Sequence, residues 1–210
     1  MLPHCPPLGK DLYDELRQSF PETWGNFPPE LASRFKRDFE TGMDALWRRD
    51  SQEQSQPLAE IGRYFARFRP DPSEPSCYMR LIRLLASFNL IDACGFATLN
   101  YDCLLDLDLH SANIGYHDGA RRGPFKHTRS VPLWKLHGAS NALPGIGTNT
   151  FTGTRFHGIS GEIFSGPVRY VTPGEAIANY DNDGLPPMLS LYAPWKANLC
   201  CKGGHRNNSS

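Results

Sequence analysis

The sequence predicts an α/β fold in which a parallel sheet is combined with a helical N-terminal layer or insertion. Apolar residues recur at helical spacing through most of the first ninety positions, with charged residues between them. Short apolar runs follow at 93–99 and 131–136, and continuous apolar runs are typical of parallel strands that are buried on both faces. A polar segment comes directly after each run, where parallel strands commonly end at a ligand-binding edge.

The composition argues against several classes of protein. The 22 basic and 22 acidic side chains give a formal net charge of zero, so no global field would draw the chain to nucleic acid or to an acidic membrane. No apolar stretch approaches the ~20 residues of a membrane span. The N-terminus lacks the basic and apolar regions of a signal peptide, so we expect a cytoplasmic protein without a membrane partner.

The cysteines predict no metal site. No pair has the Cys-x-x-Cys spacing of a structural zinc centre, and two of the six are adjacent, which is poor geometry for one ion. We therefore expect reduced thiols, some of them in the core. They are Cys5, Cys77, Cys94, Cys103, Cys200 and Cys201.

The N-terminal region is expected to be helical. Leu8, Leu12 and Leu16 lie four residues apart on one face of the first helix, which Pro21 ends. Proline suits a first helical turn, so another helix is expected to begin near Pro28. The expected helices cover 8–20, 28–47, 58–68 and 77–88.

The character of the sequence changes near residue 91. From here we expect the two apolar strands, a long glycine-containing loop between them, and further short strands. The chain then forms one domain over 1–196, followed by a polar tail that is expected to be disordered. The expected segments are a helical part at 9–90, a sheet part at 91–196, a loop at 106–130, short strands at 168–171 and 188–192, and the tail at 197–210.

Two polar segments carry the candidate chemistry. Asn100 and Asp102 follow the first strand, and His137 follows the second. The carboxyl ends of parallel strands meet at one edge of a sheet, so we expect these side chains at the same rim. His137 has the unperturbed pKa, ~6.5, of a general base near neutrality, and Gly138 lets backbone approach a ligand closely. Taken singly, an Asn-x-Asp segment after a strand is usually a turn or a helix cap, and a His-Gly segment is usually a turn.

The same segments resemble motifs of the sirtuin family. Thr98-Leu99-Asn100-Tyr101-Asp102 resembles the family's threonine-x-asparagine-hydrophobic-aspartate motif, in the tyrosine form of bacterial and fungal zinc-less members. Lys135-Leu136-His137-Gly138-Ala139-Ser140 resembles its lysine-leucine-histidine-glycine-serine motif, with Ala139 before or in place of the serine. The segment 186–196 is similar to the proline- and lysine-bearing segment that often follows. The resemblance implies a Rossmann-like sheet that binds NAD as a substrate.

The resemblance also implies a role for each matching residue. His137 would act as the general base on water or on a ribose hydroxyl, and Asn100 would orient the attacking water or the nicotinamide ribose. Asp102 would hold the nicotinamide carboxamide. Thr98, Gly138 and Ser140 would be neighbouring nucleotide contacts. No metal is required.

The chain departs from the family's pattern in three respects. The glycine-rich loop that cradles the NAD phosphates is missing, since 6–12 resembles the segment just after it. The family's C-terminal strands and the zinc-binding cysteines of its deacylating members are missing too. We therefore expect an incomplete Rossmann-like sheet, truncated at both ends, that exposes apolar surface there.

These observations leave several functions open. The first is an NAD-consuming hydrolase that cleaves the nicotinamide–ribose bond, an activity that zinc-less relatives use in defence. The second is an NAD-dependent protein deacylase. The third is a catalytically silent module that binds a nucleotide or a protein. Without the loop that cradles the phosphates, we expect the chain as given to be weakly active or inactive. A truncated gene model would give the same sequence. The partners implied are NAD and either a second copy of the chain or a fused effector or sensor domain.

Overall fold

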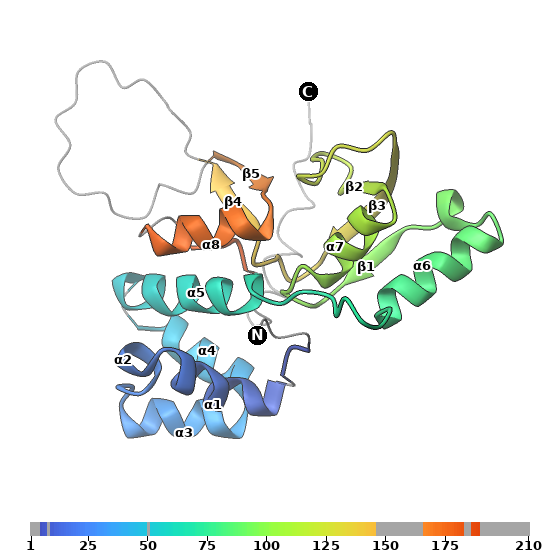
Figure 1. The fold of residues 1–210 in the computed structure, drawn as a ribbon. Coiled ribbons are helices and arrows are strands. Elements are labelled where there is room, and N and C mark those ends of the chain that lie inside the picture. Colours follow the sequence, from blue (N-terminus) through green and yellow to red (C-terminus); the bar gives the residue numbers. More distant parts are fainter. Residues whose placement is uncertain (1–4, 8, 50, 146–165, 183–185, 190–210) are drawn as a thin grey trace, which may run out of the picture.

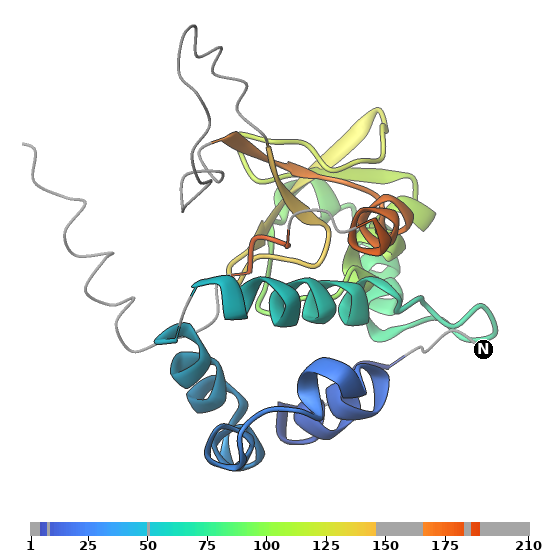
Figure 2. The same cartoon turned by 90° about the vertical axis from the view of Figure 1, so that its left-hand side faces the viewer.

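Figure 1 shows the fold in a computed structural model, which describes residues 5–7, 9–49, 51–145, 166–182 and 186–189. Helices and a parallel sheet are both present, so the predicted α/β class is confirmed. Both views place helix α5 (Ser51–Ala66) between a group of helices and the strand-bearing part (Figure 1, Figure 2). None of the helices in the described ranges is long and apolar enough to span a membrane.

The helical layer is built around an aromatic core. The ring of Phe35 lies 5.3 Å from the rings of both Tyr13 and Trp24, and 5.4 Å from that of Phe39. Aromatic side chains bury a large apolar area each, so this cluster holds the short helices together. Besides α5, the layer comprises α1 (Gly9–Ser19), α2 (Pro21–Trp24), α3 (Pro29–Arg37) and α4 (Phe39–Trp47).

The single helix predicted over 28–47 is wrong, because the chain breaks at Asp38. This residue is extended, with φ −163°, and its carboxylate accepts a hydrogen bond of 2.7 Å from the backbone N–H of Thr41. It thereby caps the N-terminus of α4. The two helices then pack closely, since a Cβ at Gly42 would lie 2.3 Å from the ring of Phe35. Helix α5 begins at Ser51, earlier than the predicted start at 58. The prediction missed its first turns because they are polar, contain Pro57 and show no apolar periodicity.

The central sheet contains the two strands that the sequence predicts. Strands β1 (Phe96–Thr98) and β3 (Arg129–Lys135) run parallel, with Phe96 opposite Leu133 and Thr98 opposite Lys135. Strand β2 (Ile114–His117) pairs in parallel with the other side of β3, which gives the order β1-β3-β2. The prediction of parallel neighbours in one sheet is confirmed.

The long loop predicted over 106–130 is wrong in its first half. Helix α7 (Leu104–Ser111) and strand β2 occupy that stretch. Leu105, Leu109 and Ile114 are buried in the core of the sheet part, at 6%, 0% and 3% exposure. The loop was predicted from the glycines and basic residues of this stretch, and the few apolar residues among them gave too weak a pattern to indicate a helix and a strand.

Two further helices and a second sheet complete the strand-bearing part. Helix α6 (Cys77–Ser87) is capped by Ser76, whose hydroxyl accepts a hydrogen bond from the backbone N–H of Met79. It comes before the first strand, β1, in the sequence. A one-turn 3-10 helix, η1 (Ile91–Ala93), leads from α6 into β1. Strands β4 (Ala142–Gly145) and β5 (Gly166–Tyr170) pair antiparallel, and α8 (Pro173–Asp181) follows them.

The C-terminal predictions are only partly covered by the structure. Strand β5 confirms the short strand expected near 168–171. Of the strand expected at 188–192, Leu189 forms an antiparallel bridge with Gly138, and positions 190–192 lie outside the described residues. The tail at 197–210 also lies outside them.

Candidate functional site

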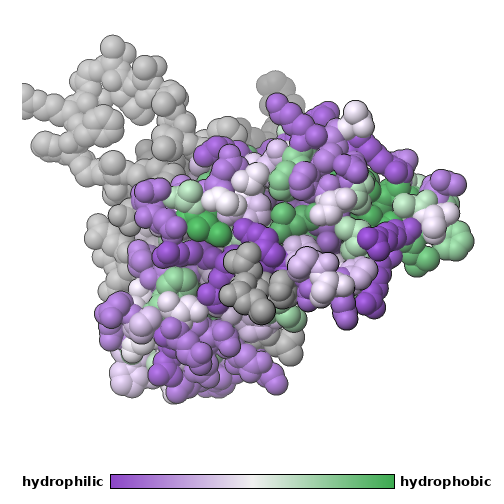
Figure 3. All heavy atoms as spheres, in the orientation of Figure 1, coloured by the Kyte–Doolittle hydropathy of each residue, from purple (hydrophilic) through white to green (hydrophobic). Residues whose placement is uncertain are grey.

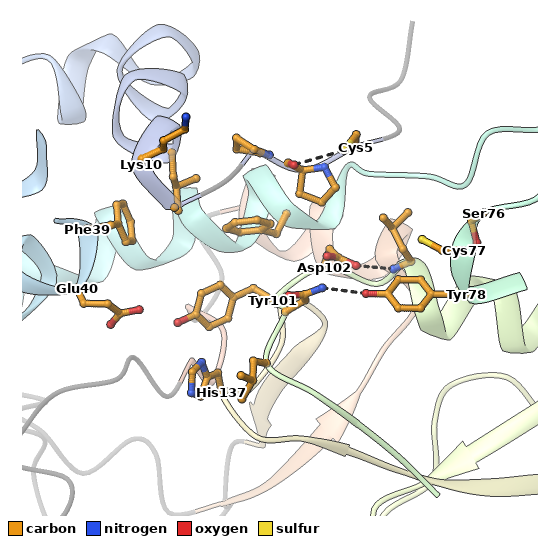
Figure 4. A pocket seen from close by; sticks show the side chains of 18 of the residues that line it. Cys5, Lys10, Phe39, Glu40, Ser76, Cys77, Tyr78, Tyr101, Asp102 and His137 are labelled. Carbon is orange, nitrogen blue, oxygen red and sulfur yellow. Dashed lines mark hydrogen bonds between the residues drawn. The ribbon is translucent and has the colours of Figure 1, made fainter. Parts of the chain in front are cut away.

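A pocket lies between the helical layer and the carboxyl ends of β1 and β3 (Figure 4). Its volume is about 760 Å³, within the range of roughly 300–1,000 Å³ that is usual for small-molecule sites. The N-terminal segment, the α3–α4 junction and the loop before α6 form one side. The other side is formed by the segments that follow β1 and β3. The polar side chains that line it include Lys10, Glu40, Asp71, Tyr78, Asn100, Tyr101, Asp102 and His137.

Backbone hydrogen bonds hold the two predicted motif segments together. The N–H of Leu136 donates to the carbonyl of Thr98 at 3.0 Å, which continues the parallel ladder beyond both strands. The N–H of Ser140 donates to the carbonyl of Tyr101 at 2.8 Å. The segments therefore run side by side to the same rim, as the sequence predicts, and Asn100 and His137 both line the pocket.

Asn100 is held in a turn and tied to α6. Its backbone N–H donates to the hydroxyl of Thr98 at 3.0 Å, and its side-chain Nδ2 donates to the hydroxyl of Tyr78 at 2.9 Å. Thr98 thus shapes the turn, and the pocket's lining does not include it. Tyr78 lines the pocket and has no counterpart in the sequence analysis, because nothing local in α6 shows which strand end it will meet.

His137 lies beside the ring of Tyr101, with 6.2 Å between ring centroids and 33° between planes. The hydroxyl of Tyr101 is buried and has no hydrogen-bond partner among the described residues. Burial, and the nearby carboxylate of Glu40, raise the pKa of this hydroxyl above its ordinary value, so it stays a neutral donor. Figure 4 shows it pointing between Glu40 and His137. A ligand in the pocket could accept its hydrogen bond.

Asp102 is the buried carboxylate of the site, with 6% of its surface exposed. One oxygen accepts a hydrogen bond of 2.9 Å from the backbone N–H of Leu104, at the start of α7. Burial raises the pKa of Asp102, and the bond from Leu104 and the charge of Lys135 act in the opposite direction. The residue therefore both lines the pocket and shapes the chain after β1.

Gly138 and Ser140 lie behind the pocket and do not line it. Gly138 has φ +76°, and a Cβ there would lie 1.9 Å from the carbonyl oxygen of Met188. The close approach expected at this glycine is therefore made by the chain's own backbone. Ser140 is fully buried, and its hydroxyl lies 3.3 Å from the sulfur of Cys103. Neither residue presents a side chain to a ligand in this pocket.

A buried polar network lies close to Asp102. The ammonium of Lys135 pairs with a carboxylate oxygen of Asp106 at 2.7 Å, and both side chains are at most 1% exposed. Asn141 bridges the pair, since it accepts from Lys135 at 3.1 Å and donates to Asp106 at 3.3 Å. It also donates to the carbonyl of Val171 at 3.0 Å. Burial alone would lower the pKa of the Lys135 ammonium, but the charge and hydrogen bond of Asp106, together with Cys103 and Tyr170, raise it above its ordinary value.

The sequence analysis expected no metal site. Among the residues that the structure describes, no group of three or more histidine, cysteine, aspartate or glutamate side chains is placed to hold a metal ion.

No protein-family model matches this sequence, and no curated protein is detectably similar to it.

Proposed function

We propose that this protein is an NAD-consuming hydrolase of the sirtuin-like family, with a Rossmann-like sheet, that cleaves the bond between nicotinamide and ribose. The observation that carries the proposal is the convergence of Asn100, Asp102 and His137 on one pocket, from the carboxyl ends of adjacent parallel strands. An amide, a carboxylate and an imidazole in one water-accessible pocket provide the groups that glycosidic cleavage of a nucleotide needs.

The reaction assigns one task to each side chain. Water attacks the anomeric carbon of the ribose, and the bonding electron pair leaves with the nicotinamide nitrogen, which becomes neutral. His137 takes the proton of the attacking water, so that ADP-ribose carries the new hydroxyl. Asn100 orients the water or the ribose, and its tie to Tyr78 fixes the direction of its side chain. Asp102 holds the carboxamide of the leaving group.

The decisive test compares nicotinamide release by the wild-type chain, His137→Ala and His117→Ala. Removing a general base lowers kcat by about 10²–10⁴-fold. Affinity for NAD, measured by calorimetry, should change little, because a base acts mainly in the transition state. His117 lies in β2 and does not line the pocket, so His117→Ala is the matched control that keeps wild-type turnover.

The same assay includes Asn100→Ala and Tyr78→Phe, with circular dichroism to confirm folding. Asn100→Ala should lose turnover, and Tyr78→Phe should lose less, because it removes only the group that orients Asn100. Equal nicotinamide release by wild type and His137→Ala would remove His137 from the mechanism. NAD binding without any release would make a silent nucleotide-binding module the better assignment.

A further inference from the structure

The hydroxyl of Tyr101 is a polar group of the pocket that the proposed reaction leaves unused. The residue lines the pocket, and the hydroxyl is buried with no hydrogen-bond partner among the described residues. A buried hydroxyl that makes no hydrogen bond destabilises a fold, and such groups are uncommon in native proteins. The hydroxyl of Tyr101 therefore points to a ligand that completes its hydrogen bonding.

Packing fixes the direction of the Tyr101 side chain. Its ring centroid lies 5.6 Å from that of Phe65 in α5 and 6.2 Å from that of His137. Its backbone carbonyl accepts a hydrogen bond of 2.8 Å from the N–H of Ser140. A donor that is already held in place loses little conformational entropy when a ligand binds. The hydroxyl is therefore preorganised for binding.

Glu40 provides a hydrogen-bond acceptor next to this donor. Figure 4 shows the Tyr101 hydroxyl pointing between Glu40 and His137. After burial, the charge of Glu40 is the second cause of the raised pKa of this hydroxyl, which stays protonated and can donate. An ionised carboxylate only accepts, at about four positions, so Glu40 has room for a ligand beside the interactions that it already makes. A neighbouring donor and acceptor match a hydroxyl group, which accepts from one and donates to the other.

The apolar part of the pocket strengthens such hydrogen bonds. Figure 3 shows a mainly hydrophilic outer surface over the helical layer, whereas the same layer lines the pocket with Leu12, Phe39 and Phe65. A hydrogen bond is electrostatically stronger in these surroundings than in water. Tyr101 and Glu40 therefore discriminate between ligands more sharply in the pocket than they would on the molecular surface.

We propose that Tyr101 and Glu40 bind the 2-hydroxyl of the ribose that is attacked in the reaction. This inference rests on the proposed function for the identity of the substrate. His137, which takes the proton of the attacking water at the anomeric carbon, is in ring contact with Tyr101. A hydroxyl on the next carbon of the sugar is therefore within reach of Tyr101. Tyr101 donates to the oxygen of this hydroxyl, and Glu40 accepts its hydrogen bond.

This pairing makes the site specific for ribose over deoxyribose. A site built to hydrogen-bond a hydroxyl rejects an analogue that lacks it, because the polar groups of the site then remain unpaired. The pairing also assists the reaction, since hydrogen bonds to the 2-hydroxyl strengthen in an oxocarbenium-like transition state. The hydroxyl keeps its proton throughout, so the balance of the hydrolysis is unchanged.

Binding of ADP-ribose, the product that the protein does not consume, tests the inference. Calorimetry measures its affinity, and that of the analogue without the 2-hydroxyl on the terminal ribose, for wild type and Tyr101→Phe. Wild type should prefer ADP-ribose at least about tenfold. Tyr101→Phe should reduce this ratio several-fold by weakening the binding of ADP-ribose alone, because the analogue makes no hydrogen bond to Tyr101.

Tyr170→Phe is the matched control. The hydroxyl of Tyr170 donates to Asp118 at 3.2 Å, and the residue does not line the pocket, so this variant should keep the wild-type ratio. Glu40→Gln keeps the shape of the side chain and should reduce the ratio as Tyr101→Phe does. Circular dichroism checks the fold of every variant, and Glu40→Gln decides should Tyr101→Phe fail to fold.

An equal fall in both affinities, or an unchanged ratio, would overturn the inference. So would a wild-type chain that does not bind ADP-ribose. Nicotinamide release from NAD is measured separately by the same proteins. Release without a preference for the 2-hydroxyl would leave the proposed function and remove this inference. A preference without release would remove the hydrolase and leave Tyr101 and Glu40 as groups that recognise the sugar.

Discussion

At the scale of single residues, the site depends on ionisable groups that are kept away from water. Lys135 and Asp106 form a buried ion pair, and the buried carboxylate of Asp102 lies close to it. Buried charges cost free energy unless they are paired and hydrogen-bonded. Asn141 provides that hydrogen bonding, so the segments after β3 and β5 are joined through one amide.

Breaking the buried pair should destabilise the fold strongly. Asp106→Leu leaves the ammonium of Lys135 without its partner, and we expect the free energy of unfolding to fall by about 3–5 kcal/mol. The double variant Asp106→Leu with Lys135→Met removes both charges and should recover much of that loss. Urea unfolding of wild type, these two variants and Lys135→Met alone gives the four free energies of unfolding of a double-mutant cycle. Purely additive effects would mean that the pair does not interact energetically.

The raised pKa of Asp102 predicts a pH dependence with a definite sign. The folded state holds this proton more tightly than the unfolded state, whose aspartates titrate near ~3.9. Stability is therefore lost as pH rises from that value through the raised pKa, and the loss is complete above it. Asp102→Asn keeps an oxygen for the N–H of Leu104 and removes the charge. The free energy of unfolding of the variant, minus that of wild type, should therefore be larger at neutral pH than at acidic pH.

Urea unfolding of wild type and Asp102→Asn from acidic to neutral pH gives the difference in their free energies of unfolding at each pH. Asp38→Asn is a control of opposite sign, because the hydrogen bond from Thr41 lowers the pKa of Asp38. The ionised carboxylate of Asp38 stabilises the wild type above the ordinary aspartate pKa, and this stabilisation is lost as pH falls through the lowered pKa. A difference between wild type and Asp102→Asn that does not vary with pH would contradict the assignment of a raised pKa to Asp102.

At the scale of elements, the sequence predicts those parts of the fold that have a strong local signal. Strands β1 and β3 are apolar runs that end in distinctive polar segments, and α1 and α6 have regular apolar spacing. The break at Asp38 was missed because a cap inside a continuous apolar pattern depends on one backbone conformation. Helix α7 and strand β2 were missed because the glycines and basic residues in the same stretch are typical of a loop, although the apolar residues between them are buried.

Helix α8 lies where the sequence was expected to form only short strands, so it was missed although its capping box is a strong local signal. The hydroxyl of Thr172 accepts from the backbone N–H of Glu175, and the carboxylate of Glu175 accepts from that of Thr172. Thr172→Ala should therefore lower the free energy of unfolding by about 1 kcal/mol. Thr172→Ser keeps the hydroxyl and should cost less. Thermal unfolding of both variants checks this, and equal losses would show that the hydroxyl does not stabilise α8.

At the scale of the whole molecule, the pocket is assembled from two parts that lie far apart in the sequence. The strand ends provide Asn100, Asp102 and His137, which the sequence analysis identified from their motifs. Glu40, in α4 of the helical layer, and Tyr78, in α6, carry no motif and reach the pocket only through packing. The sequence could therefore predict the rim of the site and could not predict the wall that faces it.

The strand order β1-β3-β2 has a consequence for how this protein is made. The central strand is the last of the three to be synthesised, so β1 and β2 have no hydrogen-bonded neighbour in this sheet until β3 arrives. Long-range parallel pairing of this kind is slow, because the intervening chain must first be closed into a loop. On the ribosome, Asn100 and Asp102 emerge well before the strand that fixes their position. The segments that follow β1 and β3 can therefore meet at one rim only after β3 has paired between β1 and β2.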